Sequence, residues 1–185
     1  MTIVGHSIMG AAIGVLAVPS VLRPRVKVSV VFAFVVLANL PDLQLPHWGH
    51  DRYDISHSIF VNTALILLLA LPLLLAYRTR SFRACLPVTF CAALAWLSHL
   101  LLDTFYNHGN GLGMFWPFST AHFALPIPWF ETLRKPLPHI DSHTAQVLLI
   151  ELLSYCPLLC MALVARLVFA KNRKSGKTSD QPDIR

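Results

Sequence analysis

Charged residues are scarce in this sequence. They make up only 13% of the 185 residues, whereas hydrophobic residues make up 55% and the mean hydropathy is +0.59. Soluble domains carry about 25% charged residues, so this composition excludes an ordinary soluble protein. Cysteine is also scarce, and the four cysteines form no CxxC pair and no secretory disulfide framework. We expect them to pack within apolar helices.

Long apolar runs are what the sequence has instead. They cover residues 2–22, 26–41, 55–77, 84–106 and 145–170. A helix needs about 20 apolar residues to cross a bilayer, and most of these runs approach that length. No positive charge precedes the first run, so it does not resemble a signal peptide. We therefore predict an all-α fold, a polytopic membrane bundle of about five transmembrane helices with a long outer loop between the fourth and the fifth.

The chain divides by polarity into two parts. Residues 1–170 are expected to form a single membrane-embedded helical domain. Residues 171–185, KNRKSGKTSDQPDIR, are polar and are expected to form a disordered cytoplasmic tail.

Lysine and arginine alternate between the connections, and this predicts the orientation of the chain in the membrane. The first connection, the third connection and the stretch after the last run are rich in them, whereas the second and fourth connections hold three in total. The N-terminus is therefore expected outside and the C-terminus in the cytoplasm of a bacterial inner membrane. This topology accounts for the net charge of +6, so no nucleic-acid partner is expected.

Histidine and acidic residues gather on the predicted outer side. All nine histidines and six of the nine acidic residues lie there. Because the topology was predicted from lysine and arginine alone, this clustering is an independent observation. Ionisable groups in a membrane domain are costly and are usually kept for a function.

Four short stretches supply candidate metal ligands. His99 and Asp103, in SHLLLD, are four residues apart and therefore share one face of a helix. The others are His6 in TIVGHSIMG, Asp42 in ANLPDLQL and His57 in YDISHSIF. Each residue alone has a structural alternative, such as a hydrogen-bonded pair, a turn or a buried histidine. Together their shared side favours a divalent metal, and imidazole with carboxylate suits zinc.

The ordered set of motifs resembles the YdjM-type family. It consists of an early histidine, NLPDLQ, SHS at the head of a helix, HLLLD, and a glycine-rich turn followed by FWPF, all within about residues 1–120. Members of that family are bacterial inner-membrane proteins described as metal-dependent hydrolases, some of them under LexA control. The resemblance implies hydrolysis. The predicted position at the membrane surface makes a lipid or amphiphilic phosphate ester the expected substrate.

More remotely, the order His, Asp, His, HxxxD is similar to the zinc-dependent phospholipase C and single-strand nuclease group. This similarity implies that His6, Asp42, His57, His99 and Asp103 are metal ligands, with Asp103 able to bridge two ions. One zinc ion is expected, with a second zinc ion and manganese as alternatives.

The stretch HDRYDISHS supplies the candidate catalytic residues, His50 and Asp54. Hydrolysis would use a metal-activated water, and Asp54 could accept its proton or orient a histidine ligand. Family members often carry a His-Arg pair before the second histidine of this stretch, and the present sequence differs there. A metal-binding membrane protein without activity, with a structural or stress-response role, stays an alternative. A transporter is disfavoured because the helix centres are apolar.

Three further features concern helix packing and the outer loop. Gly10 and Gly14 form a GxxxG motif, which predicts close helix packing. Glu151, about two turns into the last run, could bond to a neighbouring helix or join the site. The aromatic residues of the long loop could form an interfacial belt or a lid over a lipid-access groove.

Overall fold

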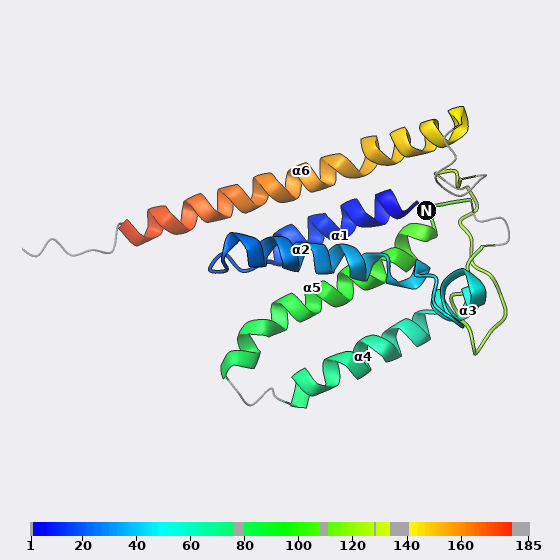
Figure 1. Ribbon diagram of the computed structural model, residues 1–185, viewed down its shortest axis with the longest axis horizontal. Coiled ribbons are helices and arrows are strands. Elements are labelled where there is room, and N and C mark those ends of the chain that lie inside the picture. The colour runs from blue at the N-terminus through cyan, green and yellow to red at the C-terminus, as the bar shows by residue number, and fades with distance from the viewer. Residues whose placement is uncertain (1, 76–79, 108–110, 128, 134–140, 179–185) are drawn as a thin grey trace, which may run out of the picture.

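The computed structural model describes residues 2–75, 80–107, 111–127, 129–133 and 141–178, and its regular structure there is helical. Five long helices form a bundle (Figure 1): α1 (Ile3–Ala17), α2 (Pro24–Ala38), α4 (Ile59–Leu75), α5 (Arg80–Asp103) and α6 (Ser142–Thr178). Three single turns join α2 to α4: η1 (Leu40–Asp42), η2 (Gly49–Arg52) and α3 (Tyr53–Ser56). The described residues contain no strand, only two isolated β-bridges in the loop after α5. The all-helical prediction is confirmed.

Two helices are long and apolar enough to cross a membrane. Their apolar windows are Leu86–Asp103 in α5 and Ser142–Asn172 in α6. The apolar helices Ile3–Ala17 and Ile59–Pro72 are shorter. At 1.5 Å per residue, a 15-residue helix such as α1 covers about 22 Å, less than the roughly 30 Å hydrocarbon core. Length and composition therefore support two spans, and the arrangement of five stays a prediction.

Prolines set the ends of the first two helices. Val18 precedes Pro19 and is extended, with φ −65° and ψ 126°, as expected for a residue before proline. Pro24 is the first residue of α2, where its missing N–H group breaks no helical hydrogen bond. The observed α1 is consequently shorter than the apolar run that contains it, whereas α2 begins two residues before its run and ends at Ala38.

Close packing against α2 positions α1 within the bundle, where α1 also contacts α5 and α6. A Cβ atom on Gly10 would lie 2.7 Å from the Phe34 carbonyl oxygen and 2.8 Å from the Ala38 Cβ. A Cβ atom on Gly14 would lie 3.0 Å from the Phe34 Cβ. Only glycine fits at Gly10 without displacing α2, so the GxxxG motif serves helix packing, as predicted.

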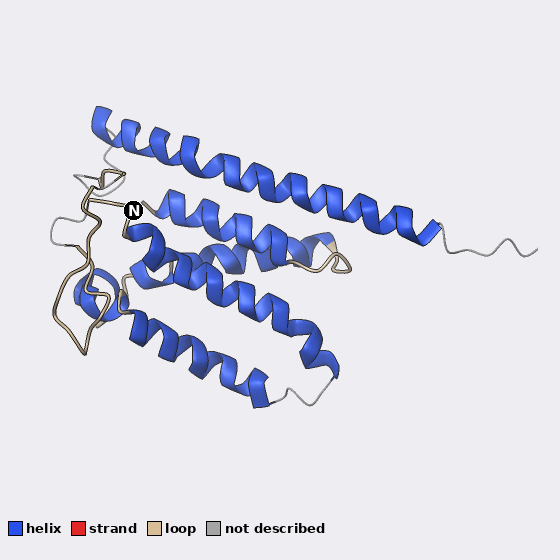
Figure 2. Ribbon diagram, turned by 180° about the vertical axis from the view of Figure 1, so that it is seen from behind, coloured by secondary structure: helices blue, strands red, loops and turns tan. Residues whose placement is uncertain are grey.

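One end of the bundle gathers several chain segments. The start of α1, the ends of α2 and α5, and the starts of α4 and α6 all lie there, together with the loop after α5 (Figures 1 and 2). The described loop keeps large aromatic side chains exposed, among them Phe118 and Trp129. At the opposite end, α6 continues to Thr178, so it runs through the first half of the segment expected to be a disordered tail. Residues 179–185 lie outside the described residues.

Candidate metal centre

Five side chains meet at the end of the bundle where the loops gather. They are His6 of α1, Asp42 of η1, His57 just before α4, and His99 and Asp103 at the end of α5. Asp42 keeps 24% of its side chain exposed, and the other four are buried. Donor atoms of His6, Asp42 and His99 lie within 4.8 Å of one another, as do those of His57, His99 and Asp103. The structure thus brings together every metal ligand that the sequence predicts.

The Nε2 atoms of His57 and His99 lie close to each other and to one oxygen of each carboxylate. The His57 Nε2 atom lies 3.3 Å from His99 Nε2, 3.3 Å from Asp42 Oδ1 and 3.4 Å from Asp103 Oδ2. The His99 Nε2 atom lies 3.7 Å and 3.5 Å from the same two oxygens. Ligands at about 2.0–2.2 Å from a tetrahedral zinc ion are about 3.3–3.6 Å apart. The five measured separations are close to that range.

Backbone hydrogen bonds orient two of the imidazoles. The Nδ1 atom of His99 lies 2.8 Å from the Ala38 carbonyl oxygen, and that of His57 lies 2.8 Å from the Ser56 hydroxyl oxygen and 3.2 Å from the Tyr53 carbonyl oxygen. When Nδ1 carries the proton and donates it there, the lone pair of Nε2 points into the cluster. Two such nitrogens 3.3 Å apart, beside two carboxylates, require a cation or additional protons between them.

His6 approaches the cluster from the other side of His99. The two rings stack with centroids 3.7 Å apart. His6 Nε2 lies 3.2 Å from Asp103 Oδ1, the carboxylate oxygen that does not face His57. Both ring nitrogens are buried, and neither makes a hydrogen bond of acceptable geometry within the described part of the chain. An unsatisfied buried polar group costs about 1–3 kcal/mol, so this imidazole fits a metal-binding set better than an apolar core.

Asp42, a member of the cluster, and Tyr53, which lies beside it, are less buried than the other four side chains of the cluster. Burial alone would raise the pKa of Asp42, but hydrogen bonds with His57 and His99 outweigh it and hold this pKa well below its usual range. Asp42 is therefore ionised at neutral pH. The Tyr53 ring stacks on His57 with centroids 3.9 Å apart. Burial, together with the carboxylates of Asp103 and Asp42, raises the pKa of Tyr53, which remains a neutral phenol.

Asn62 of α4 supports the segment that carries His57, a role that sequence analysis missed. Its Nδ2 atom donates to the carbonyl groups on either side of His57, each at 2.7 Å. Its Oδ1 atom accepts from the indole N–H of Trp96 at 2.7 Å. Because Trp96 lies one turn before His99 on α5, Asn62 couples the positions of both histidines. A single amide within an apolar run was the available indication in the sequence.

The two candidate catalytic residues are not part of the five-residue cluster. Asp54 is exposed, and its carboxylate lies 3.5 Å from His122 in the loop after α5. A Cβ atom on Gly113 would lie 2.7 Å from Asp54 Oδ1, so the loop passes directly against this carboxylate. The backbone of His50 belongs to η2, but its side chain lies outside the described residues. Their proposed catalytic roles stay predictions.

Of the two roles considered for Glu151, a bond to a neighbouring helix or a place in the site, the structure shows the first. Its Oε1 atom accepts from the Thr2 backbone N–H at 3.0 Å, and Oε2 accepts from the Thr2 hydroxyl. The same hydroxyl accepts from the Val4 N–H at 3.2 Å and caps α1. Glu151 is fully buried. It therefore ties α6 to the turn of α1 that precedes His6.

Comparison with known proteins identifies the family. The family model described as "YdjM inner membrane protein" matches residues 1–172. The chain belongs to this family. Within the curated proteins, the chain is similar to "Inner membrane protein YbcI" of Escherichia coli (strain K12), with 31% identity over 130 residues, which cover 68% of this chain and 72% of the relative. No solved structure matches. The family and the relative both support a location in the inner membrane.

Proposed function

We propose that this YdjM-family protein is a membrane-embedded, metal-dependent hydrolase. The observation that carries the proposal is the convergence of three imidazoles and two carboxylates at one end of an otherwise apolar bundle, including His6, whose buried ring nitrogens make no hydrogen bond of acceptable geometry within the described part of the chain. Zinc is the proposed metal because it accepts nitrogen and oxygen donors at tetrahedral spacing. Manganese prefers six oxygen ligands, which this nitrogen-rich set supports less well.

The five donors divide into two sets in this proposal. His57, His99, Asp42 and Asp103 Oδ2 would hold the first ion. His6 and Asp103 Oδ1 would supply donors for a second ion, with Asp103 as the bridge. When bound, such an ion lowers the pKa of a coordinated water to about 7 and polarises the oxygen under attack.

The protein's own residues fix the geometry of these donors. The carbonyl groups of Ala38 and Tyr53 hold the Nδ1 atoms of His99 and His57, so each ring presents Nε2. Such outer hydrogen bonds orient metal ligands and are worth about 10–100-fold in metal affinity or activity. Asp54 is the proposed proton acceptor, although its described contacts with the loop require it to reach the site through a water or a rearranged loop.

We further propose that five helices span the membrane and that the cluster lies on its outer side. The basic connection between α1 and α2 and the basic end of α6 lie at the opposite end of the bundle (Figure 1), which supports this orientation through the positive-inside rule. A lipid or an amphiphilic phosphate ester is the proposed substrate class because the cluster lies where the apolar helices meet the loops.

One observation favours a second candidate function. A closed shell of four protein ligands is typical of structural zinc sites, and the donors around His57 and His99 approach that arrangement. The alternative is a metal-binding membrane protein that catalyses nothing. His6 separates the two hypotheses, because a structural site would not need it.

Metal analysis of the detergent-purified protein tests the proposal. We expect one or two equivalents of zinc in the intact protein and almost none in Asp103→Ala and His99→Ala. His143→Ala is the matched control, because His143 lies on α6 and its described contacts are with Glu131 and Thr132. This control should keep all of its metal. If the intact protein neither carries zinc nor takes it up, the cluster is a hydrogen-bonded network and the proposal is wrong.

An activity screen with phosphate esters and phospholipids then separates the enzyme from the structural protein. If the protein is an enzyme, His6→Ala should retain at least part of the metal but lose most of the turnover. A zinc-loaded protein that hydrolyses none of these substrates, with the same metal content in His6→Ala, would support the structural alternative.

A further inference from the structure

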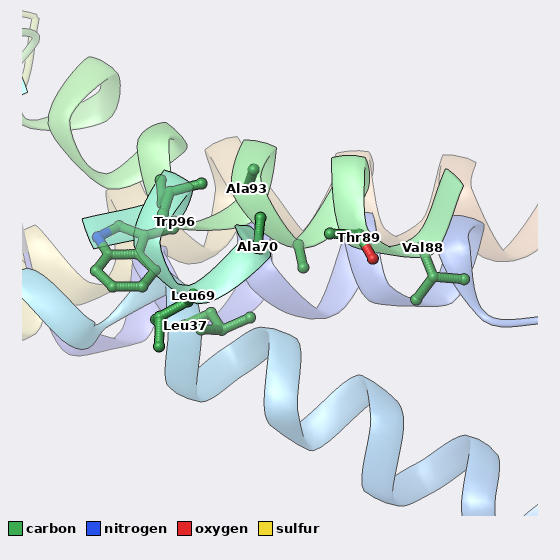
Figure 3. Close-up of a pocket in the computed structure, with 9 residues that line it drawn as sticks. Leu37, Leu69, Ala70, Val88, Thr89, Ala93 and Trp96 are labelled. Atoms are coloured by element: carbon green, nitrogen blue, oxygen red, sulfur yellow. The ribbon is translucent and has the colours of Figure 1, made fainter. Parts of the chain in front are cut away.

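An apolar groove is lined mainly by α5 and α4, with Leu37 of α2 at its side (Figure 3). It encloses about 280 Å³. Leu37 comes from α2, Leu69 and Ala70 from α4, and Val88 and Trp96 mark its extent along α5. The described lining is apolar except for Thr89 and the indole N–H of Trp96, and that N–H group is bonded to Asn62.

One end of this groove adjoins the metal centre. Trp96 precedes His99 by one helical turn, and its indole bonds to the same Asn62 that supports the His57 segment. Leu37 precedes Ala38, whose carbonyl group accepts the hydrogen bond from His99. The eight residue steps from Val88 to Trp96 correspond to about 12 Å along α5. The groove therefore runs from the middle of the bundle towards the five donors.

The volume of the groove indicates what kind of molecule it can bind. A helix about 10 Å wide and 12 Å long would occupy roughly 900 Å³, several times the volume of the groove. A single hydrocarbon chain is much narrower and needs no polar partner. The flank of α4 beside the groove exposes large apolar side chains such as Leu67 and Leu68, so a chain can enter sideways from the bilayer.

We propose that this groove binds one acyl chain of a membrane lipid, with the lipid head group held at the metal centre. The inference rests on the proposed function and deepens it, because it narrows the substrate class from a lipid or an amphiphilic phosphate ester to a bilayer lipid. The apolar groove supplies binding for the chain, and the five-donor cluster faces the ester.

Photolabelling in a defined bilayer tests the inference. The protein is placed in nanodiscs of phosphatidylethanolamine and phosphatidylglycerol with a trace of phosphatidylglycerol that carries a diazirine on one acyl chain. Labelled positions are mapped by mass spectrometry. We expect labels concentrated on the groove side of α5, around Val88–Trp96, and at least a fivefold loss of these labels in Ala93→Phe, which fills the groove.

Two further variants show whether a loss of labelling is caused by the filled groove or by misfolding. Ala70→Phe fills the same groove from α4 and should also lose the labels. Ala64→Phe adds the same ring to an exposed position of α4 that does not line this groove, and it should be labelled like the unchanged protein. Equal labelling in Ala93→Phe and the unchanged protein, or labels spread evenly over all lipid-facing helices, would overturn the inference.

Zinc content, measured on the same samples, separates this inference from the proposed function. A protein that holds zinc but shows no preferred labelling of the groove refutes the acyl-chain site and leaves the metal centre standing. A protein whose groove is labelled but which holds no zinc refutes the metal-dependent reaction and supports a lipid-binding groove alone.

Discussion

The two halves of the bundle are held together in different ways. Near the loops, buried polar side chains bond to one another across helices, as Asn62 does with Trp96 and Glu151 with Thr2. Towards the other end, α4 exposes Leu67, Leu68 and Leu69 by 57–64% and is supported mainly by α5. In a bilayer, apolar contact alone gives little preference for one helix position over another. Hydrogen bonds are concentrated where the positions of individual atoms matter.

Removing the buried amide of Asn62 should cause the largest loss of stability at the polar end of the bundle. Asn62→Leu leaves the Trp96 N–H and the carbonyl groups beside His57 without their amide partner, at a cost of about 2–4 kcal/mol in the free energy of unfolding. Unfolding in mixed detergent micelles, with zinc content alongside, measures this. The exposed neighbour Thr63 supplies the control, and Thr63→Leu should change neither quantity. An Asn62→Leu variant of unchanged stability would show that the polar end is not held by this network.

Close contact between α1 and α2 should be the next most sensitive feature. Gly10→Ala places a methyl group 2.7 Å from the Phe34 carbonyl oxygen and should cost about 1–3 kcal/mol by overpacking. Zinc affinity should fall too, because Ala38, against which the new methyl group presses, holds His99. Gly14→Ala meets its nearest atom only at 3.0 Å and should cost less. Equal costs for the two variants would contradict this account of the packing.

Weakening the contact between α6 and α1 should have a smaller effect. Glu151→Gln keeps an oxygen for the Thr2 N–H but removes the charge, and we expect a loss of about 0.5–1.5 kcal/mol in stability. Because Thr2 caps the turn that leads to His6, any loss of zinc should concern the donor set around His6. Stepwise zinc titration measures both sets. Glu131→Gln, at a carboxylate that is 69% exposed, is the control and should leave both unchanged.

The apolar half should tolerate substitution almost without effect. Leu68→Ala alters a side chain that is 64% exposed, and we expect a change within about 0.5 kcal/mol with unchanged zinc content. Detergent unfolding of this variant gives the baseline for the other three. A loss of several kcal/mol would mean that this face of α4 is covered by protein in the membrane, such as a second copy of the chain, and would remove the contrast between the halves.

Much of this architecture could be predicted from the sequence. The five apolar runs match the five long helices because apolar composition persists for whole helices. The five donors were recognisable because histidine and aspartate are costly beside apolar runs. Their convergence is expected because the predicted topology puts the helix ends that carry them on the same side of the membrane.

Other features required the structure. The sequence of α4 gives no reason to pair Asn62 with Trp96, 34 positions away, because one amide can bond to any nearby polar group. The contacts of Asp54 with the loop were equally hidden, since loop conformation depends on local backbone angles. The close spacing of the Nε2 and carboxylate oxygen atoms depends on side-chain rotamers, which apolar patterns do not determine.

The order of the donors along the chain bears on how the protein is made. All five occur between residues 6 and 103, whereas α6 begins only at Ser142. A ribosome synthesises the chain from its N-terminus, so every donor exists before the first residue of α6. The hydrogen bond between Thr2 and Glu151 can form only after α6 has been synthesised. The donors can therefore come together before α6 has been synthesised, whereas the contact that holds the start of α1 against α6 forms only later.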